Sequence, residues 1–103
     1  MVQQSHYVSA MVVGVCRIDL HFPDGHSLKG KRQRLSSLKT RLGNSFNVSV
    51  AELEGQDLWQ RSILGIACIA NEGRHVNHVL DQALNMIRSN PTLEVLDAKI
   101  ELW

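Results

Sequence analysis

One stretch of the chain concentrates positive charge. Residues 26–45 contain no Asp or Glu and hold six cationic side chains: Lys29, Lys31, Arg32, Arg34, Lys39 and Arg41. The other residues carry the five remaining basic side chains and all 10 acidic ones, so a formal net charge of +1 conceals two oppositely charged parts. This separation indicates an anionic partner, because clustered cations attract polyanions.

The chemistry expected of this segment is phosphate binding. Lys and Arg side chains bind nucleic-acid phosphates, and N–H groups in the first turn of a helix attract anions. We therefore predict a nucleic-acid interface formed by the six cations, with an anion site at Ser27 and Gly30. Two alternatives stay open: a basic face that only contacts solvent, and a regulatory site for a small anionic ligand at the same turn.

Other polar clusters predict no catalytic or metal site. His75 and His78 are three positions apart near Glu72, but no Cys or further carboxylate completes a metal-binding set at a fixed spacing. Asp19 with His21 and His26 could form an acid–base site, yet no nucleophile motif and no Gly-rich phosphate loop accompany them. We expect no enzymatic activity, no metal and no cofactor.

Two further pairs of residues have ordinary structural interpretations. Cys16 and Cys68 lie in apolar runs without a C-x-x-C motif, which predicts buried free thiols. Glu52 and Arg61 lie on neighbouring predicted strands, so we expect a cross-strand ion pair between them.

Hydrophobic periodicity predicts four strands and two helices. The strands are expected over residues 12–22, 46–53, 59–70 and 93–103. Ser27 is the expected N-cap of the first helix, which would end at Gly43 and Asn44. Asn71 is expected to cap the second helix, and Asn90-Pro91 to end it.

Each helix has an apolar stripe that would face a sheet. The stripes are Leu28, Leu35, Leu38 and Leu42 in the first helix, and Val76, Val79, Leu80, Ala83 and Ile87 in the second. The cations of the first helix flank its leucine stripe on both sides. Lys31 falls over the stripe itself, so either its stem runs along apolar surface or the helix begins after it.

The order β-α-β-β-α-β predicts a ferredoxin-like α+β fold, in which two helices cover one face of a four-stranded antiparallel sheet. With 103 residues, 44% hydrophobic and 20% charged, the chain is expected to form a single domain over residues 11–103 after an N-terminal extension of residues 1–10. No signal sequence or membrane span is visible in the sequence, so we expect a cytoplasmic protein without a membrane partner.

The face of the sheet away from the helices is predicted to be unusually apolar. Its expected members are Val13, Val15, Arg17, Ala51, Leu53, Trp59, Ile63, Ala67, Ile69, Val95 and Trp103. An apolar face of this kind favours an interface, here a homodimer with Val13, Val15, Leu53, Trp59, Ile63 and Trp103 at its centre. The alternatives are inverted strand faces and RNA stacking, although the third strand lacks the aromatic residues of an RNA-recognition motif.

Four segments resemble the YlxP-like bacterial proteins. They are residues 13–20 (VGVCRIDL), 27–32 (SLKGKR), 46–52 (FNVSVAE) and 57–61 (DLWQR). The likeness as a whole covers nearly the entire chain after residue 10. The N-terminal residues before them depart from the family pattern. The resemblance implies a small ferredoxin-like domain of unknown function with no catalytic residues to transfer. Genes of the family often lie beside those of translation and ribosome-maturation factors, which implies RNA or the ribosome as a partner.

The charge and the resemblance together predict a non-catalytic, dimeric binding protein that contacts RNA or the ribosome through its basic helix. The alternatives are a regulatory module for a small anionic ligand and a homo-oligomeric protein that uses the sheet face alone.

Overall fold

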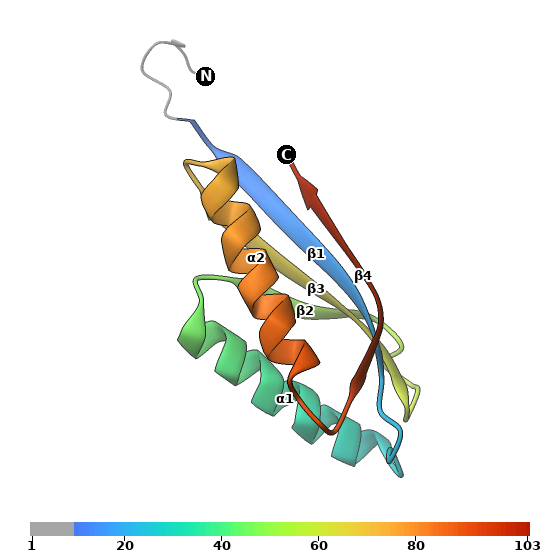
Figure 1. Ribbon diagram of the computed structural model, residues 1–103. Coiled ribbons are helices and arrows are strands. Elements are labelled where there is room, and N and C mark those ends of the chain that lie inside the picture. Colours follow the sequence, from blue (N-terminus) through green and yellow to red (C-terminus); the bar gives the residue numbers. More distant parts are fainter. Residues whose placement is uncertain (1–9) are drawn as a thin grey trace.

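The computed structural model describes residues 10–103, which fold in the order β-α-β-β-α-β. The elements are β1 (Val12–His21), α1 (Leu28–Ser45), β2 (Ser49–Glu54), β3 (Arg61–Ala70), α2 (Gly73–Arg88) and β4 (Glu94–Leu102). The strands form one antiparallel sheet in the order β2-β3-β1-β4, and both helices lie on the same side of it (Figure 1). The predicted ferredoxin-like α+β fold is confirmed.

The alternation of β1 divides its side chains between two environments. Cys16 and Ile18 are buried against the helices, whereas Arg17 between them is exposed on the open face. The register places Ile66 of β3 beside Cys16 and Leu64 beside Ile18, and both of these side chains are also buried. Because side chains alternate along a strand, the paired inward positions form one continuous apolar layer beneath the helices.

α1 begins as predicted and ends later. Ser27 is the N-cap, and its Oγ accepts a hydrogen bond from the Gly30 N–H at 3.0 Å. The prediction that Gly43 and Asn44 end the helix is wrong, because both are helical and Phe46 is the C-cap. The leucine stripe is buried at Leu35, Leu38 and Leu42. Packing of this stripe holds the last turn in place and outweighs the cost of about 1 kcal/mol that glycine adds to a helix.

α2 packs on the sheet through the predicted apolar face. The buried members are Val76, Leu80, Ala83 and Ile87, with Leu84 beside them, and Val79 is half-buried. The expected cap is wrong, because Glu72 rather than Asn71 occupies the N-cap position and makes no side-chain capping bond. The helix ends at Arg88, just before Asn90-Pro91.

β-bulges change the faces of both edge strands. The register of β2 shifts between Glu52 and Glu54, and that of β4 shifts where it passes Asp19 and Leu20. After the second shift Val95 pairs with Leu20 and packs against the core, so its predicted place on the open face is wrong. β2 and β3 are also shorter at their starts than predicted, because residues 46–48 and 59–60 lie outside the strands.

Three other expectations concern the chain as a whole. Apart from residue 10, the expected N-terminal extension lies outside the described residues. Cys16 and Cys68 are free and buried, as predicted. Within residues 10–103 neither helix is long and apolar enough to cross a membrane.

Candidate nucleic-acid interface

Lys31 is removed from the surface by a buried ion pair. Its side chain is fully buried, and Nζ donates to Oε2 of Glu52 at 3.1 Å, to the carbonyl of Gly55 at 2.5 Å and to that of Arg61 at 3.2 Å. Ser62 Oγ donates to the same Glu52 oxygen at 2.6 Å. The ammonium group thus has three acceptors inside the protein. The inclusion of Lys31 in a phosphate-binding surface is wrong, because its place over the leucine stripe directs it inward.

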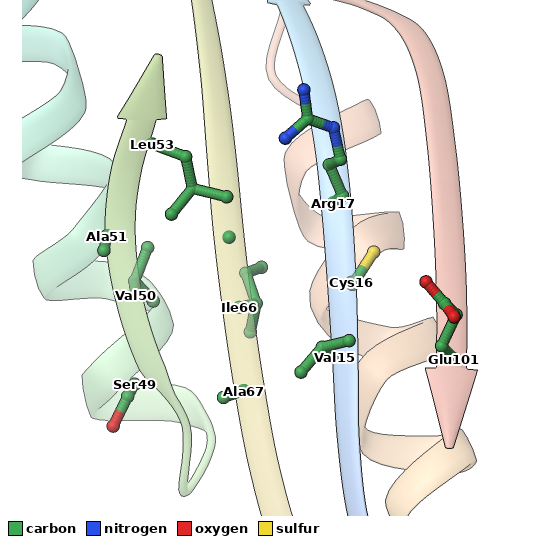
Figure 2. A pocket seen from close by; sticks show the side chains of 11 residues that line it. Val15, Cys16, Arg17, Ser49, Val50, Ala51, Leu53, Ile66, Ala67 and Glu101 are labelled. Carbon is green, nitrogen blue, oxygen red and sulfur yellow. The ribbon is translucent and has the colours of Figure 1, made fainter. Parts of the chain in front are cut away.

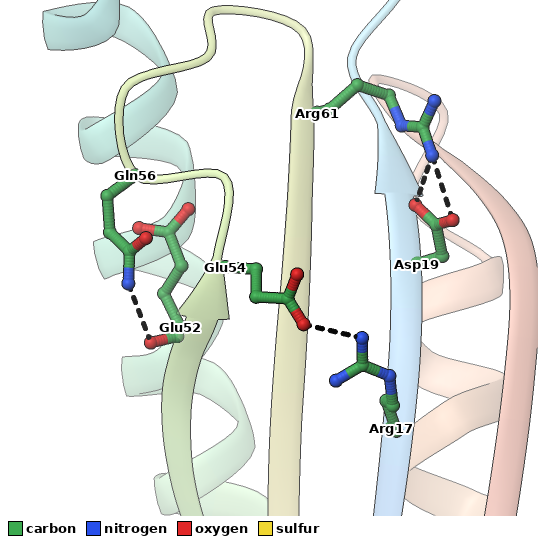
Figure 3. Close-up of polar contacts among 6 residues, drawn as sticks. All are labelled: Arg17, Asp19, Glu52, Glu54, Gln56 and Arg61. Carbon is green, nitrogen blue, oxygen red and sulfur yellow. Dashed lines mark hydrogen bonds and ion pairs between the residues drawn. The ribbon is translucent and has the colours of Figure 1, made fainter.

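The expected ion pair between Glu52 and Arg61 is wrong as well. Arg61 Nη2 donates to both carboxylate oxygens of Asp19 at 2.8 Å, and Figure 3 shows Glu52 separated from this pair, on β2. Glu52 pairs with Leu64 in the strand register, and Leu64 is buried beneath the helices. The Glu52 carboxylate therefore meets Lys31 on the helix side, and Asp19 is engaged in an ion pair on the other side.

The other five cations of the basic segment lie at the surface of α1. Lys29, Arg32, Lys39 and Arg41 are exposed, and Arg34 is half-buried. Across residues 10–103 no carboxylate lies within ion-pair distance of any of the five. The Arg34 guanidinium stacks 6.0 Å from the centre of the Phe22 ring and donates to the carbonyl of Thr92 at 3.5 Å. These side chains are thus not neutralised by the described part of the chain.

The five cations lie on two sides of α1. With Leu35 at zero and 100° per residue, Lys39, Arg32 and Lys29 fall at about 40°, 60° and 120°. Arg34 and Arg41 fall at about −100° and −120° on the same wheel. The buried leucines lie between the two groups on the inner side of the helix, so both groups border the surface that faces away from the sheet.

The Arg34 side of α1 borders a groove that no sequence pattern indicates. The groove has a volume of about 560 Å³ and is lined by Gly30, Gln33, Arg34, Ser37, Leu38, Arg41, Asn90 and Thr92. Oδ1 of Asn90 accepts hydrogen bonds from the N–H and Oγ1 of Thr92, at 2.9 and 2.7 Å. These bonds hold the α2–β4 connection in a turn opposite the arginines. In the sequence Asn90-Pro91 indicates only the end of a helix, because its position beside α1 depends on the tertiary fold.

The predicted anion site at the first turn of α1 is occupied by the chain itself. The N–H of Gly30 donates to Ser27 Oγ, and the N–H of Lys31 donates to the Ser27 carbonyl at 3.2 Å. The prediction that the Gly30 N–H binds an anion is therefore wrong. The surface cations of α1, rather than the backbone of its first turn, form the candidate interface.

A second groove crosses the open face of the sheet (Figure 2). It has a volume of about 410 Å³ and is lined by Val15, Cys16, Arg17, Ser49, Val50, Ala51, Leu53, Gly65, Ile66, Ala67 and Glu101. Leu53 lies over Gly65, where an added Cβ would be 2.8 Å from Leu53 Cδ1. Because Gly65 has no side chain, Leu53 can pack over its backbone, and no side chain of Gly65 projects into the groove.

The residues of the predicted dimer interface lie in strands β1 and β3, near the C-terminal ends of β2 and β4, and in the β2–β3 connection. Val13, Val15 and Ile63 are half-buried in β1 and β3, and Leu53 and Trp103 are 47% and 73% exposed. Trp103 exchanges backbone hydrogen bonds with Val13, which brings the C-terminus alongside β1. Trp59 lies in the β2–β3 connection, so its expected place within a strand is wrong.

Two further ion pairs at the surface involve side chains of β1. Arg17 Nη2 contacts Glu54 Oε2 at 2.7 Å across the open face, as Figure 3 shows, and His21 Nδ1 lies 2.7 Å from Glu94 Oε1. In the part of the chain that the structure describes, no three His, Cys, Asp or Glu side chains are grouped so that they could hold a metal ion.

These features define a small ferredoxin-like α+β protein with a basic surface helix. The sequence matches the family described as "Protein of unknown function (DUF503)" over residues 13–100, and the chain belongs to this family. "Uncharacterized protein YlxP" of Bacillus subtilis (strain 168) is 36% identical over 83 residues, which are 81% of this chain and 90% of that protein. The resemblance to YlxP-like proteins is thereby confirmed.

Two de novo designed proteins of known structure are also similar to the chain. Foldit4 has a TM-score of 0.49 and 13% identity, covering 90% of this chain and 96% of its own. Ferredog-Diesel has a TM-score of 0.42 and 11% identity, covering 98% of this chain and 93% of its own.

Proposed function

We propose that this protein is a non-catalytic RNA-binding protein that contacts structured RNA, free or within the ribosome, through the outer face of α1. The observation that carries the proposal is the set of five surface cations on one helix, none of which has a carboxylate partner within residues 10–103. A cation without a carboxylate partner in the protein can contact a phosphate directly. An ion-paired cation would first have to leave its carboxylate.

The rigid attachment of α1 supports the proposal. The leucine stripe is buried, Ser27 caps the first turn, and Lys31 ties the helix to the β2–β3 connection. The cationic side chains are therefore presented from a backbone that is already ordered. Beyond the translational and rotational freedom that any association loses, binding then orders side chains but no backbone, at about 0.5–1.5 kcal/mol for each side chain immobilised.

The test is the salt dependence of RNA binding. The variant Lys29→Gln, Arg32→Gln, Lys39→Gln removes three exposed cations and leaves the buried Lys31 intact. We expect it to bind structured RNAs of every sequence more weakly, with a salt slope flatter by about 0.7–0.9 for each phosphate that it no longer neutralises. Fluorescence anisotropy titrations at several salt concentrations measure both quantities.

A matched control removes the same charge elsewhere. Arg74 and Arg88 are exposed on α2, and their double Gln variant has the same net charge as Lys29→Gln with Arg32→Gln on α1. We expect this control to retain most of the affinity and the salt slope, and the α1 double variant to be weakened. Equal weakening in the two double variants would show that net charge, rather than α1, determines binding, and would refute the proposal.

We also propose that the open face of the sheet pairs with a second copy of the chain. The face combines exposed apolar side chains at Leu53, Ile69 and Trp103 with charges of both signs, including Lys99 and Glu101. A two-fold axis parallel to the strands would stack β2 of one copy on β4 of the other. Charges of both signs on one face can then meet opposite charges of the same face.

A further inference from the structure

The exposed surface of α1 is divided lengthwise into three strips. One row of cations consists of Lys29, Arg32 and Lys39, and the other of Arg34 and Arg41. Between the rows lies a strip of uncharged polar side chains, all of them exposed: Gln33, Ser37, Thr40 and Asn44. On the helical wheel this strip covers about 140° to 200°, the side opposite the buried leucines.

Two rows of cations fit two phosphate backbones. An α-helix with its side chains is about 10–12 Å wide, so the two rows can reach backbones on both sides of a groove at once. A single strand offers one track of phosphates, and proteins that bind it usually stack its bases on aromatic side chains. α1 contains no aromatic residue. The arrangement therefore favours a duplex over a single strand.

The depth to which α1 can enter a groove is small. Its inner side is packed on the sheet through Leu35, Leu38 and Leu42, so only the outer half protrudes. The strip that would face the floor of a groove includes the short side chains of Ser37 and Thr40. The B-DNA major groove is about 8.5 Å deep. The minor groove of A-form RNA is wide and shallow and displays 2′-hydroxyl groups, which side-chain hydroxyls and amides can bind.

We infer that α1 lies along the minor groove of double-stranded RNA, an inference that rests on the proposed RNA-binding function. The row of Lys29, Arg32 and Lys39 contacts the phosphates of one strand, and Arg34 and Arg41 contact those of the other. The uncharged strip donates and accepts hydrogen bonds with 2′-hydroxyl groups. With 18 residues, α1 is about 27 Å long, which is enough to follow the groove across several base pairs.

The two strands meet different surroundings in this arrangement. The Arg34 row borders the open groove that Asn90 and Thr92 line on its far side, so one backbone lies between α1 and the α2–β4 connection. The opposite row contains long, exposed side chains, of which Lys29 and Lys39 are flexible. Arg34 is also held by Phe22 and the Thr92 carbonyl, which limits its movement before binding. The Arg34 side is thus the better-ordered half of the contact.

The experiment compares three nucleic acids at one salt concentration: an RNA duplex, one of its single strands, and a DNA duplex of the same sequence. We expect the full chain to bind the RNA duplex at least about tenfold more tightly than the other two, a difference of about 1.4 kcal/mol. An RNA single strand or a DNA duplex that binds as tightly would overturn the inference and leave the proposed function intact. Binding to none of the three RNA and DNA probes would overturn both.

Variants of the uncharged strip and of the cation rows distinguish hydrogen bonding to 2′-hydroxyl groups from binding to phosphates. Ser37→Ala with Thr40→Ala is expected to lower the preference for RNA over DNA about three- to tenfold, at an unchanged salt slope, because it removes hydroxyl groups and no charge. Arg34→Gln with Arg41→Gln is expected to flatten the salt slope. The control Gln82→Ala with Asn85→Ala changes exposed polar residues of α2 and should alter neither quantity. An unchanged RNA preference in the strip variant contradicts the inference, and circular dichroism verifies that each variant is folded.

Discussion

Nζ of Lys31 lies 3.1 Å from Oε2 of Glu52, and both side chains are largely withdrawn from water, at 0% and 15% exposure. This contact joins the start of α1 to β2, 21 residues further along the chain. The carbonyls of Gly55, in the β2–β3 connection, and of Arg61, at the start of β3, complete the environment of the ammonium group. The second of the six cations of the basic segment is thus structural, whereas the cations on either side of it lie at the surface.

Breaking this pair from one side is expected to destabilise the protein strongly. Lys31→Met leaves the Glu52 carboxylate buried without its cation, and Glu52→Gln leaves the ammonium group without its anion. Each should lower the free energy of unfolding by about 3 kcal/mol, the lower end of the range for a stranded buried charge. Urea denaturation measures the change. The double variant should lose clearly less than the sum of the two, and simple additivity would show that the charges do not interact.

The surface pair of Arg17 and Glu54 provides the comparison. Its atoms are closer, at 2.7 Å, but the side chains are 51% and 63% exposed. Solvent screens the attraction, so Arg17→Ala should change the free energy of unfolding by at most about 1 kcal/mol in the same urea experiment. A loss as large as that of Lys31→Met would mean that burial is not what distinguishes the two pairs.

Two glycines are expected to respond in opposite directions to the same substitution. A Cβ at Gly14 would overlap Val76 Cγ1 and lie 2.8 Å from Leu80 Cδ1 and 2.9 Å from Leu102 Cδ2. Gly14→Ala should therefore destabilise the protein by about 1–3 kcal/mol through overpacking between β1 and α2. A Cβ at the exposed helical Gly43 would meet nothing within 4 Å.

Gly43→Ala should accordingly stabilise the protein by up to about 1 kcal/mol, because alanine favours the helix. Thermal or urea denaturation of the two variants tests both signs together. A destabilised Gly43→Ala would indicate that α1 needs the flexibility of glycine near its C-terminal end, and a neutral Gly14→Ala would indicate loose packing of α2.

Local periodicity predicted most of the fold, because buried residues recur every three or four positions in the helices and every second position in the strands. The leucines of α1, the Ser27 cap and the alternation of β1 all have the places that their spacing indicates. The errors arise where tertiary packing overrides a local signal. Gly43 and Asn44 resemble a helix end, yet buried Leu42 keeps that turn helical.

The candidate site was predicted only in part, because bulges and distant partners leave no local pattern. Glu52 lies on the helix side by regular alternation, opposite buried Leu64, but its partner Lys31 is 21 positions away on α1, and the shift in β4 turns Val95 inward. The position of Lys31 over the leucine stripe indicated an unusual environment without identifying its partner. The groove between Arg34 and Thr92 joins residues 58 positions apart, which only the packed fold brings together.

Self-association through the open face is expected to depend on its apolar side chains. Sedimentation equilibrium should find a dimer for the unchanged protein and a monomer for Leu53→Lys, because the substitution places a charge in the apolar part of the face. Gln82→Lys adds the same charge on exposed α2, on the other side of the sheet, and should leave the dimer intact. A monomeric unchanged protein at high concentration would contradict the proposed pairing.

Cys16 is expected to make stability fall at alkaline pH. Burial, with a smaller contribution from Asp81 and an opposing one from Arg88, raises the pKa of the Cys16 thiol from 9.0 to about 11. Between these two values the unfolded chain releases the proton and the folded chain keeps it, so rising pH favours unfolding.

The loss should begin near pH 9 and level off above about pH 11, amounting to about 1 kcal/mol by pH 10. Burial also raises the pKa of the Cys68 thiol, so Cys16→Ala is the necessary reference. Urea denaturation at pH 8 and pH 10 should show a smaller decrease for Cys16→Ala than for the unchanged protein. Equal decreases would mean that the Cys16 thiol ionises as easily in the folded chain as in the unfolded one, and that β1 does not keep it from water.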